Sequence, residues 1–396
     1  MFARSATMGN TRASMSGTSN KYGTHAFFFP SITAKACAPR LLNRKMKISC
    51  IVPVYNTSKY LKQCLGSLIN QTHRDTEIII VNDCSTDNSA SICQEYAQQY
   101  PDRVVFINKA VNEGVDKARF DAINYLLSRN SADCVTFIDS DDYVEPEALA
   151  QLAKAMEETD ADVIEMRNSR CIRDFKFKRN PYIEAKTISQ PQLFDDYYVS
   201  FFGINILSVS IWGKLYRLDL FRKAKLTPSG FKMGEDLIMN MKLFPFINRY
   251  RIIDYYGYNY RVGGLTSRYN PTLWTDLKSQ YYLKRQQLVD CDYMKALKPL
   301  NIELKNILIS AIIQRISFLK ESDDTLRQWV LAELNDTVLW HDIEEMSETE
   351  PDPIYKYIAT KDADSIILIV KERLHAQRWR RRAKKLLIHL SKLFGK

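Results

Sequence analysis

The sequence has no apolar run long enough to cross a membrane and no cysteine pattern typical of a disulfide or zinc framework. A bilayer span takes about 18 to 20 consecutive apolar residues, and no stretch approaches that length. The eight cysteines are scattered without a C-x-x-C pair, and the five histidines form no ligand cluster. We therefore expect a protein of a reducing compartment, soluble or peripheral to a membrane, whose buried thiols act as small core side chains.

Glycine is missing where many nucleotide-binding proteins need it. The turn after the first predicted strand reads VPVYNTSKYL, without the G-x-G-x-x-G of a dinucleotide-binding fold. The sequence also lacks G-x-x-x-x-G-K-[ST], which excludes a P-loop NTPase. A diphosphate bound at this turn would need positive charge from elsewhere, most simply from a divalent cation.

Acidic residues are absent from one end of the chain and nearly absent from the other. The net charge is +10, but residues 1–47 hold eight Lys/Arg and no acid, and residues 371–396 hold ten Lys/Arg and one Glu. The body between them therefore carries a net charge of −7. An acidic body does not favour nucleic acid as a partner.

The remaining composition is that of a globular protein. Hydrophobic residues make up 45% of the 396 residues, which is enough for a large core. Residues 1–45 are rich in Ser, Thr and Ala without periodicity, as in a transit peptide or, more simply, a disordered extension or a mis-set start. We favour the simpler interpretation, because Met46 opens a clean strand pattern.

From Met46 onward the sequence alternates between strand and helix patterns. Strands are predicted at residues 47–52, 77–82, 103–108 and 134–139, with amphipathic helices between them. Such βαβ units predict an α/β fold with a mainly parallel, Rossmann-like sheet covered by helices. Residues 147–270 mix both patterns, and residues 271–370 are predicted to be mostly helical.

Polar clusters follow three of the predicted strands. They are PVYN (residues 53–56), NDCSTDNS (82–89) and DSDD (139–142). Each alone could be turn and cap chemistry, and for NDCSTD taken alone this is the better explanation. Together they share the edge of a parallel sheet where ligands bind, and this convergence is the first indication of a site.

The DSDD segment is typical of a metal site rather than of an acid/base pair. Alternate residues of extended chain point the same way, so Asp139 and Asp141 can converge on one Mg²⁺ or Mn²⁺. A glycosidase pair would need its carboxylates about 5 Å or more apart across a sugar. The sequence therefore predicts a divalent cation that clamps a leaving diphosphate.

Residues 46–146 resemble the nucleotide-sugar-binding half of a family 2 glycosyltransferase of the GT-A fold. The matching segments are SCIVPVYN, VNDCSTDNS, NEGVDKAR and FIDSDD, in the family's order and spacing. The resemblance continues more loosely to about residue 270. It implies a GT-A domain at 46–270, divided into a donor half at 46–146 and an acceptor half at 147–270, followed by a helical extension.

The resemblance also implies roles for individual residues. Asp141 would bind the metal with help from Asp139, which with Ser140 and Asp142 would also lie at the ribose or sugar. The other donor contacts that it implies are Pro53, Tyr55 and Asn56 at the base, Asp83 and Asp87 on the next loop, and Asn112, Gly114 and Arg119 near the ribose and diphosphate. Phe120 and Asp116 depart from the family pattern, which usually has Asn and a small Ser there.

The acceptor half contains GEDLIMNMKLF (residues 234–244), which begins a predicted helix. Acidic residues in a first helical turn favour the helix dipole and by themselves indicate nothing more. Beside DSDD, the segment resembles the family's acceptor-side motif, which implies Asp236 as general base with Glu235 orienting it. Trp212 in WGKLY and Arg261 in GYNYR resemble residues that flank the sugar and phosphate, although ordinary packing explains them equally well.

Residues 371–396 are predicted to form a basic amphipathic helix. Apolar residues recur at helical spacing in RWRRRAKKLLIHLSKLF, with Arg and Lys on the other face. Such a helix can lie on an anionic membrane or can pack its apolar stripe on the body. We expect the first, and hence a cytoplasmic enzyme at the inner face of the membrane.

The sequence thus predicts an inverting, metal-dependent glycosyltransferase. The donor would be a nucleoside-diphosphate sugar, most simply UDP-linked, and the acceptor a hydroxyl of a saccharide or lipid-linked saccharide in bacterial surface-polysaccharide synthesis. Two alternatives remain: a nucleotidyltransferase that makes sugar nucleotides, and a non-catalytic nucleotide-binding scaffold on the membrane. The first should carry a glycine-rich phosphate loop, and the second should tolerate loss of Asp236.

Overall fold

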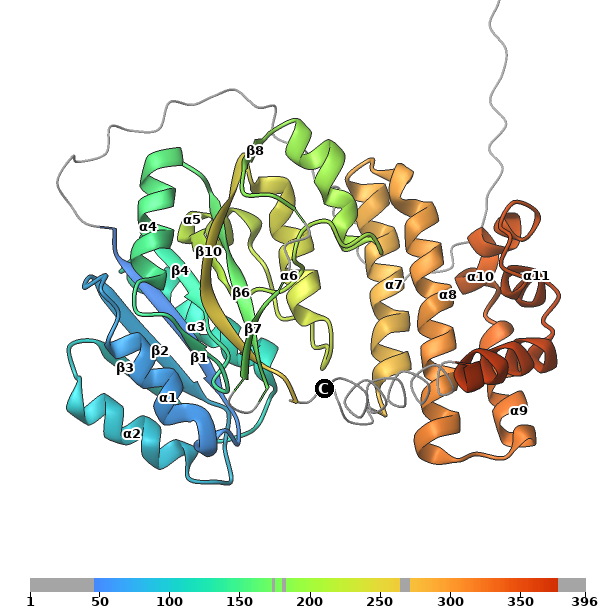
Figure 1. Ribbon diagram of the computed structural model, residues 1–396, viewed down its shortest axis with the longest axis horizontal. Helices are drawn as coiled ribbons and strands as arrows, with labels where there is room; N and C mark the ends of the chain where they lie inside the picture. The colour runs from blue at the N-terminus through green and yellow to red at the C-terminus, as the bar shows by residue number, and fades with distance from the viewer. Residues whose placement is uncertain (1–45, 173–174, 180–182, 264–270, 377–396) are drawn as a thin grey trace, which may run out of the picture. The chain divides into compact units, whose positions relative to one another are not determined.

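The computed structural model describes residues 46–172, 175–179, 183–263 and 271–376 (Figure 1). The predicted N-terminal extension and residues 377–396 of the predicted basic tail lie outside this part of the chain. Every structural statement below concerns the described residues.

The first half contains the four strands and three helices that the sequence predicts. Their bounds are β1 (Ile48–Val54), α1 (Ser58–Ile69), β2 (Thr76–Asn82), α2 (Ser89–Gln99), β3 (Val104–Asn108), α3 (Val115–Arg129) and β4 (Cys134–Phe137). The strands are parallel in the order β3-β2-β1-β4. Every residue of β1 and β2 is buried, as expected for strands covered on both faces.

The second half extends this sheet with strands of both directions. Its elements are β5 (Tyr143–Val144), α4 (Ala148–Thr159), β6 (Val163–Ile172), β7 (Phe175–Lys178), β8 (Thr187–Ser189), β9 (Lys214–Arg217), α5 (Leu218–Ala224), α6 (Glu235–Leu243) and β10 (Arg249–Arg261). Strand β9 runs antiparallel between β4 and β6, and β10 pairs in parallel with β6. The predicted α/β class and its helix-covered sheet are confirmed.

Two apolar cores lie on opposite faces of the sheet. Cys50 and Val52 belong to the core under α1, α2 and α4, whereas Ile51 belongs to the core under α3, α5 and α6. Successive strand residues point to opposite faces, so β1 contributes to both. Six of the seven described cysteines are buried, as the sequence predicts for core thiols, and none of these seven forms a disulfide within the described residues.

The predicted helical extension begins directly after the sheet domain. It comprises α7 (Leu273–Asp290), α8 (Leu297–Gln314), α9 (Asp323–Leu334), α10 (Thr337–Glu344), α11 (Ile354–Ala359) and a helix over residues 363–376. Helices α7 and α8 pack side by side (Figure 1). Gln280 on α7 donates to the carbonyl of Met233, just before α6. Within the described ranges, no helix combines the length and apolar character that a bilayer crossing requires.

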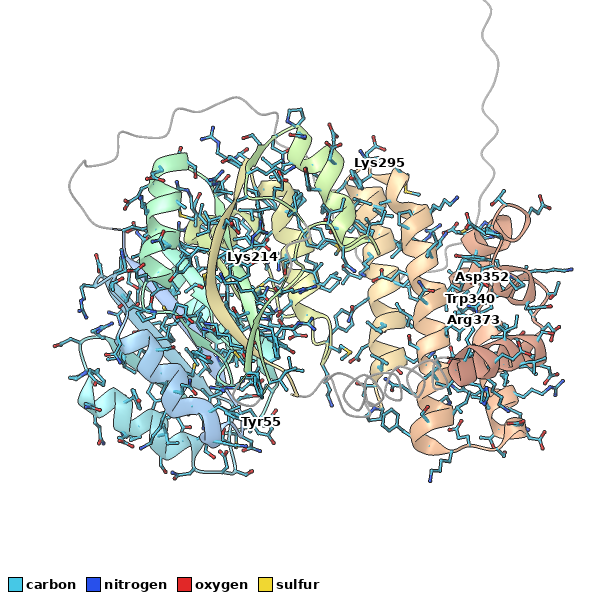
Figure 2. The ribbon with its side chains drawn as sticks, in the orientation of Figure 1. Tyr55, Lys214, Lys295, Trp340, Asp352 and Arg373 are labelled. Carbon is cyan, nitrogen blue, oxygen red and sulfur yellow. The ribbon has the colours of Figure 1, made fainter. Side chains whose placement is uncertain are left out.

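A carboxylate ties the end of the extension together, and we predict that its loss destabilises this part of the chain. Asp352 accepts hydrogen bonds from Lys305 Nζ at 2.7 Å and from Arg373 Nη2 at 2.8 Å (Figure 2). Burial alone would raise the pKa of Asp352, but the hydrogen bonds from Arg373 and Lys305 outweigh it and lower the pKa to about 2. Asp352→Asn is therefore expected to lower the free energy of unfolding by about 1 kcal/mol near neutral pH.

The pH dependence of this difference provides the check. A depressed pKa stabilises the fold above the unfolded-state pKa, so the difference should vanish as the pH falls from about 4 towards 2. Urea unfolding of both proteins across this range measures it. Asp364→Asn, in an exposed pair with Arg327, should change little. An equal loss for both variants would contradict the special role of Asp352.

Candidate active site

The loops after β1 and β2 are fastened to each other. Asn56, at φ +52°, accepts hydrogen bonds at Oδ1 from the backbone amides of Thr86 (2.8 Å) and Asp87 (3.3 Å). Asp87 in turn accepts from the amides of Ser58 and Ser89. Burial alone would raise the pKa of Asp87, but these hydrogen bonds outweigh it and lower the pKa to about 2. Asn56 and Asp87 are therefore brought together, and each holds loop backbone.

The other residues predicted at the base lie at different depths. Pro53 is buried within β1, whereas Tyr55 leaves 47% of its surface exposed at the strand end (Figure 2). An exposed aromatic ring beside fixed loop backbone is suited to stacking on a base. Of the residues predicted at the base, Tyr55 is therefore the one that offers an exposed aromatic ring to a ligand.

Asp83 is buried and holds the turn that begins α3. Its carboxylate accepts from the amides of Glu113 (3.0 Å) and Gly114 (2.7 Å), and Lys109 Nζ lies 2.9 Å away. Gly114 has φ +96°, a conformation that side chains other than glycine rarely adopt. The structure therefore joins Asp83 and Gly114, with exposed Asn112 at the same turn.

Arg119 is the centre of the site. Its buried guanidinium contacts Asp139 at 2.9 Å, Glu235 at 3.1 Å and Asp236 at 2.6 Å. The first carboxylate follows β4, and the other two begin α6. The arginine expected near the diphosphate therefore joins the predicted metal carboxylate to the predicted base.

Helix α3 contacts the segment before α6 at a second point. Asp116 is buried and accepts from the amide and hydroxyl of Ser229 and from the amide of Gly230. Phe120 packs in the apolar core on the same side. The two departures from the family pattern thus have structural roles: Asp116 fixes a loop, and Phe120 fills the core.

The three aspartates of DSDD have different surroundings. Asp139 bonds to Arg119 and keeps 27% of its side-chain surface exposed. Asp142 is buried, accepting from Tyr258 OH at 2.9 Å and from the amide of Arg261 at 2.7 Å. Asp141 is only partly buried, and the Arg261 guanidinium donates to its carbonyl. Asp139 and Asp141 can therefore reach a ligand, whereas Asp142 holds β10 against the loop.

Burial and mutual repulsion raise the pKa values of several of these acids. Burial raises the pKa of Asp139 to about 6, although Arg119 opposes the shift. Burial, with the nearby charge of Asp139, raises the pKa of Asp142 to about 8. Burial, with Asp236 beside it, raises the pKa of Glu235 to about 7. Burial also raises the pKa of Asp141. Burial is the largest cause in each case, and neighbouring negative charge adds to it for Asp139, Asp142 and Glu235.

Asp236 is held by both of its carboxylate oxygens. Oδ1 accepts from Arg119, and Oδ2 accepts from the amide of Ile211 at 3.1 Å. The carbonyl of Ser210, in the same peptide unit, accepts from the buried ammonium of Lys214 at 2.5 Å (Figure 2). Burial lowers the pKa of Lys214. One peptide unit thus connects a buried cation to the predicted base.

Sequence reasoning did not assign a role to Lys214 or Tyr258. Lys214 lies in WGKLY, the segment of Trp212, and Tyr258 lies in GYNYR, the segment of Arg261. The burial of a lysine would have been the signal, but nothing in the pattern shows that Lys214 is buried. Tyr258 is stacked against Trp212, with ring centroids 4.6 Å apart, and bonds to Asp142.

The remaining predicted residues lie around this centre. Ser140 is buried and accepts from Thr57 Oγ1 at 2.9 Å, which joins the loops after β1 and β4. Trp212 is partly buried and also stacks on Tyr260. The guanidinium of Arg261 lies over the ring of Tyr60, 4.8 Å from its centroid. All the predicted clusters therefore meet at one edge of the sheet.

Comparison with known proteins identifies the class. The profile of the family described as Glycosyl transferase family 2 matches residues 49–224. GlyA, a glycosyltransferase of Streptococcus pneumoniae, is 33% identical over 58% of this chain and 32% of its own length. EpsJ, an uncharacterized glycosyltransferase of Bacillus subtilis, is 30% identical over 60% of this chain and 68% of its own. The chain belongs to family 2 of the glycosyltransferases, as the sequence motifs predict.

A solved structure supports the fold. The crystal structure of residues 1–349 of Staphylococcus aureus TarS with UDP-GlcNAc superposes with a TM-score of 0.59. It is 22% identical and covers 84% of this chain and 92% of that one. The predicted GT-A fold is therefore confirmed. The chain spans about a third of GlyA, and 54% of the full-length TarS sequence.

Proposed function

We propose that this protein transfers a sugar, with inversion, from a UDP-sugar to a hydroxyl of a saccharide or lipid-linked saccharide in surface-polysaccharide synthesis. The observation that carries the proposal is the bonding of Asp139 and Asp236 to one buried guanidinium, which brings a donor-side and an acceptor-side carboxylate together. The relatives support the substrate class. TarS is a poly(ribitol-phosphate) β-N-acetylglucosaminyltransferase, and its structure was solved with UDP-GlcNAc.

The residues fit a divalent cation that is completed by the donor. Among the described residues, no group of three or more His, Cys, Asp or Glu side chains forms a preformed metal site. Mg²⁺ and Mn²⁺ are commonly held by one or two carboxylates, with substrate phosphates supplying further ligands. We assign Asp141 and Asp139 to this role. A bound cation would stabilise the charge that develops on the departing diphosphate.

The charge of the site supports the same assignment. In the part of the chain that the structure describes, Arg119 is the one guanidinium that bonds to the carboxylates of Asp139, Glu235 and Asp236. Arg261 meets the DSDD segment through the backbone, since its guanidinium donates to the carbonyl of Asp141 and its amide to the carboxylate of Asp142. Burial, with repulsion from neighbouring carboxylates, raises the pKa of Asp139, Asp142 and Glu235, which makes it unfavourable to ionise these three together. A divalent cation would supply positive charge that opposes this repulsion.

The protein's own groups account for the rest of the transfer. Tyr55 would stack on the base, and the loops fixed by Asn56 and Asp83 would position the nucleotide. Asp236 would accept the proton of the attacking hydroxyl, because Arg119 and the Ile211 amide leave lone pairs on its oxygens. Glu235 would orient Asp236 or the acceptor, and Trp212 would contact a sugar face.

The metal assignment predicts a strong dependence on Asp141. EDTA should abolish transfer or donor hydrolysis, and Mg²⁺ or Mn²⁺ should restore it. Asp141→Asn should lower kcat/KM at least about a hundredfold, because one neutral ligand replaces a charged one. A panel of UDP-, GDP- and dTDP-sugars, assayed for hydrolysis with each metal, measures both effects and identifies the donor.

The same substitution on an exposed loop provides the control. Asp102→Asn, at an exposed position before β3, should leave the rate unchanged. Full activity of the wild-type enzyme in EDTA would contradict the metal assignment. Full activity of Asp141→Asn in excess Mg²⁺ would contradict the choice of ligand.

The proposal includes the cellular place of the enzyme. We propose that it works in the cytoplasm at the inner face of the membrane, with residues 371–396 as a basic attachment and residues 46–270 as the catalytic domain. The tail's charge supports this. Vesicle co-sedimentation of the full chain, compared with a chain ending at Arg373, tests it; equal binding of both would exclude the tail.

A further inference from the structure

One corner of the sheet presents an open apolar face. Strands β6, β7 and β10 lie side by side there (Figure 1). Ile172 pairs with Phe175, and Arg170 pairs with Phe177 across the antiparallel hairpin. Directly opposed residues share a face. On this face Phe175 is 68% exposed, Phe177 53% and Ile172 47%.

Strand β10 continues the same face towards the active site. Tyr260 pairs with Arg170, and Val262, which follows the end of β10 and donates its amide to the carbonyl of Cys171, is 43% exposed. Tyr260 stacks on Trp212, which stacks on Tyr258. Tyr258 is buried and its OH bonds to Asp142, so this row of stacked rings links the open face to the DSDD segment. We call Ile172, Phe175, Phe177 and Val262 the apolar corner.

The side chains on the opposite face of the hairpin contact other parts of the protein. Cys171, Arg261 and Lys176 alternate to that side. Cys171 contacts the hydroxyl of Tyr143, Arg261 lies over the Tyr143 ring, and Lys176 bonds to Glu145. Only one side of the hairpin therefore lacks a protein partner among the described residues.

The charge around the apolar corner indicates what covers it. The described residues of this hairpin include four basic side chains, those of Arg170, Lys176, Lys178 and Arg179, and no acid, although the body of the chain, residues 48–370, carries −7. Lys176 is paired with Glu145, and Arg170 lies on the open face itself. Phe, Ile and Val offer no polar atoms to a saccharide, whereas exposed aromatic and aliphatic side chains among basic ones are typical of membrane-surface segments. Basic side chains are attracted to an anionic lipid surface when they lie close to it.

We propose that the apolar corner inserts into the headgroup layer of an anionic membrane, so that a lipid-linked acceptor reaches Asp236 along the Trp212–Tyr260 face. The proposal rests on the proposed function, because only an acceptor held at a membrane makes this placement useful. It is separate from the basic tail: the corner orients the active site, and the tail increases affinity.

A tryptophan placed at the corner reports insertion directly. Phe175→Trp in the full chain should be quenched by vesicles of brominated phosphatidylglycerol, relative to unbrominated ones. Val289→Trp, a site on α7 that is 53% exposed, is the matched control and should show no quenching beyond that of the five native tryptophans. Equal quenching at both positions, or none at Phe175→Trp, would overturn the proposal.

Removing the apolar side chains tests how much the corner contributes to membrane binding. The double variant Phe175→Ser/Phe177→Ser should lower the partition coefficient onto phosphatidylglycerol vesicles at least about tenfold. This follows from the usual free energy of removing two such rings from water. Val289→Ser/Leu368→Ser, at two other exposed positions, should leave it unchanged. Binding to pure phosphatidylcholine vesicles should be weak for every variant, and strong binding there would remove the anionic-lipid specificity from the proposal.

Two further readouts separate the possible failures. Metal-dependent hydrolysis of a UDP-sugar without vesicles should be unchanged in Phe175→Ser/Phe177→Ser. If this variant instead raises KM for a soluble oligosaccharide and keeps its vesicle binding, the corner is a saccharide subsite and the membrane proposal is wrong. If the wild type shows no hydrolysis with any sugar nucleotide while quenching at Phe175→Trp persists, the proposed function fails and the membrane contact stands.

Discussion

Asp236→Asn is expected to lower kcat for transfer by roughly a hundredfold to ten-thousandfold, the usual contribution of a positioned general base. The change keeps the size of the side chain but removes its ability to accept the proton of the attacking hydroxyl. Donor binding should persist, because Tyr55 and the loops after β1 and β2 lie on the other half of the domain. Initial rates with saturating donor and a thermal shift with UDP measure the two effects.

Two variants provide the comparison for this result. Glu235→Gln should retain more activity than Asp236→Asn, because an orienting group is easier to replace than the proton acceptor. Asp219→Asn, in an exposed pair on α5, should be silent. Full transferase activity in Asp236→Asn would refute the base assignment and would favour a non-catalytic, nucleotide-binding scaffold.

Arg119→Met is expected to lower the free energy of unfolding by about 3 to 5 kcal/mol and to remove nearly all activity, because the buried carboxylates lose the cation that pairs with them. Three carboxylates, those of Asp139, Glu235 and Asp236, would then face one another without the guanidinium. Urea unfolding in EDTA measures the cost. Arg119→Lys should rescue it only partly, since an ammonium lacks the planar fork that contacts three acids.

A double variant shows whether charge is the cause. Arg119→Met/Asp236→Asn should recover part of the lost stability, because removing one negative charge relieves repulsion among the rest. Arg222→Met, in an exposed pair with Asp219, should change stability by less than about 0.5 kcal/mol. If the double variant were no more stable than Arg119→Met, lost packing rather than unpaired charge would explain the effect.

The part of the fold that forms the donor half could be predicted from periodicity alone. The apolar residues of α1, Leu61, Cys64, Leu65 and Leu68, recur at helical spacing and are all buried. The centres of β1 and β2 are apolar runs, CIVPV and IIIV, as in buried parallel strands. Placement of the polar loops at one edge then followed from the parallel order, without any information about side-chain contacts.

The bonding partners of the charged side chains in the site could not be predicted in the same way. Asp142 turns towards Tyr258, and Arg119 turns towards Glu235 and Asp236, partners more than a hundred positions away. A local pattern contains no information about such distant partners. The burial of Lys214 likewise depends on two carbonyls in the loop before it and on the sheet behind it. The sequence therefore predicted the location of the site more fully than its internal bonding.

Helix α3 fastens the segment that carries Asp236, the proposed base, at two points, and this limits how the enzyme can diverge. Asp116 and Arg119 are three residues apart and face the same way. One inserted residue between them would rotate one anchor by about 100° and release either Ser229 or Asp236. Residues 231–234 lie between the two anchored points. We expect relatives to vary in length there, so that a new acceptor can be accommodated while the base keeps its position.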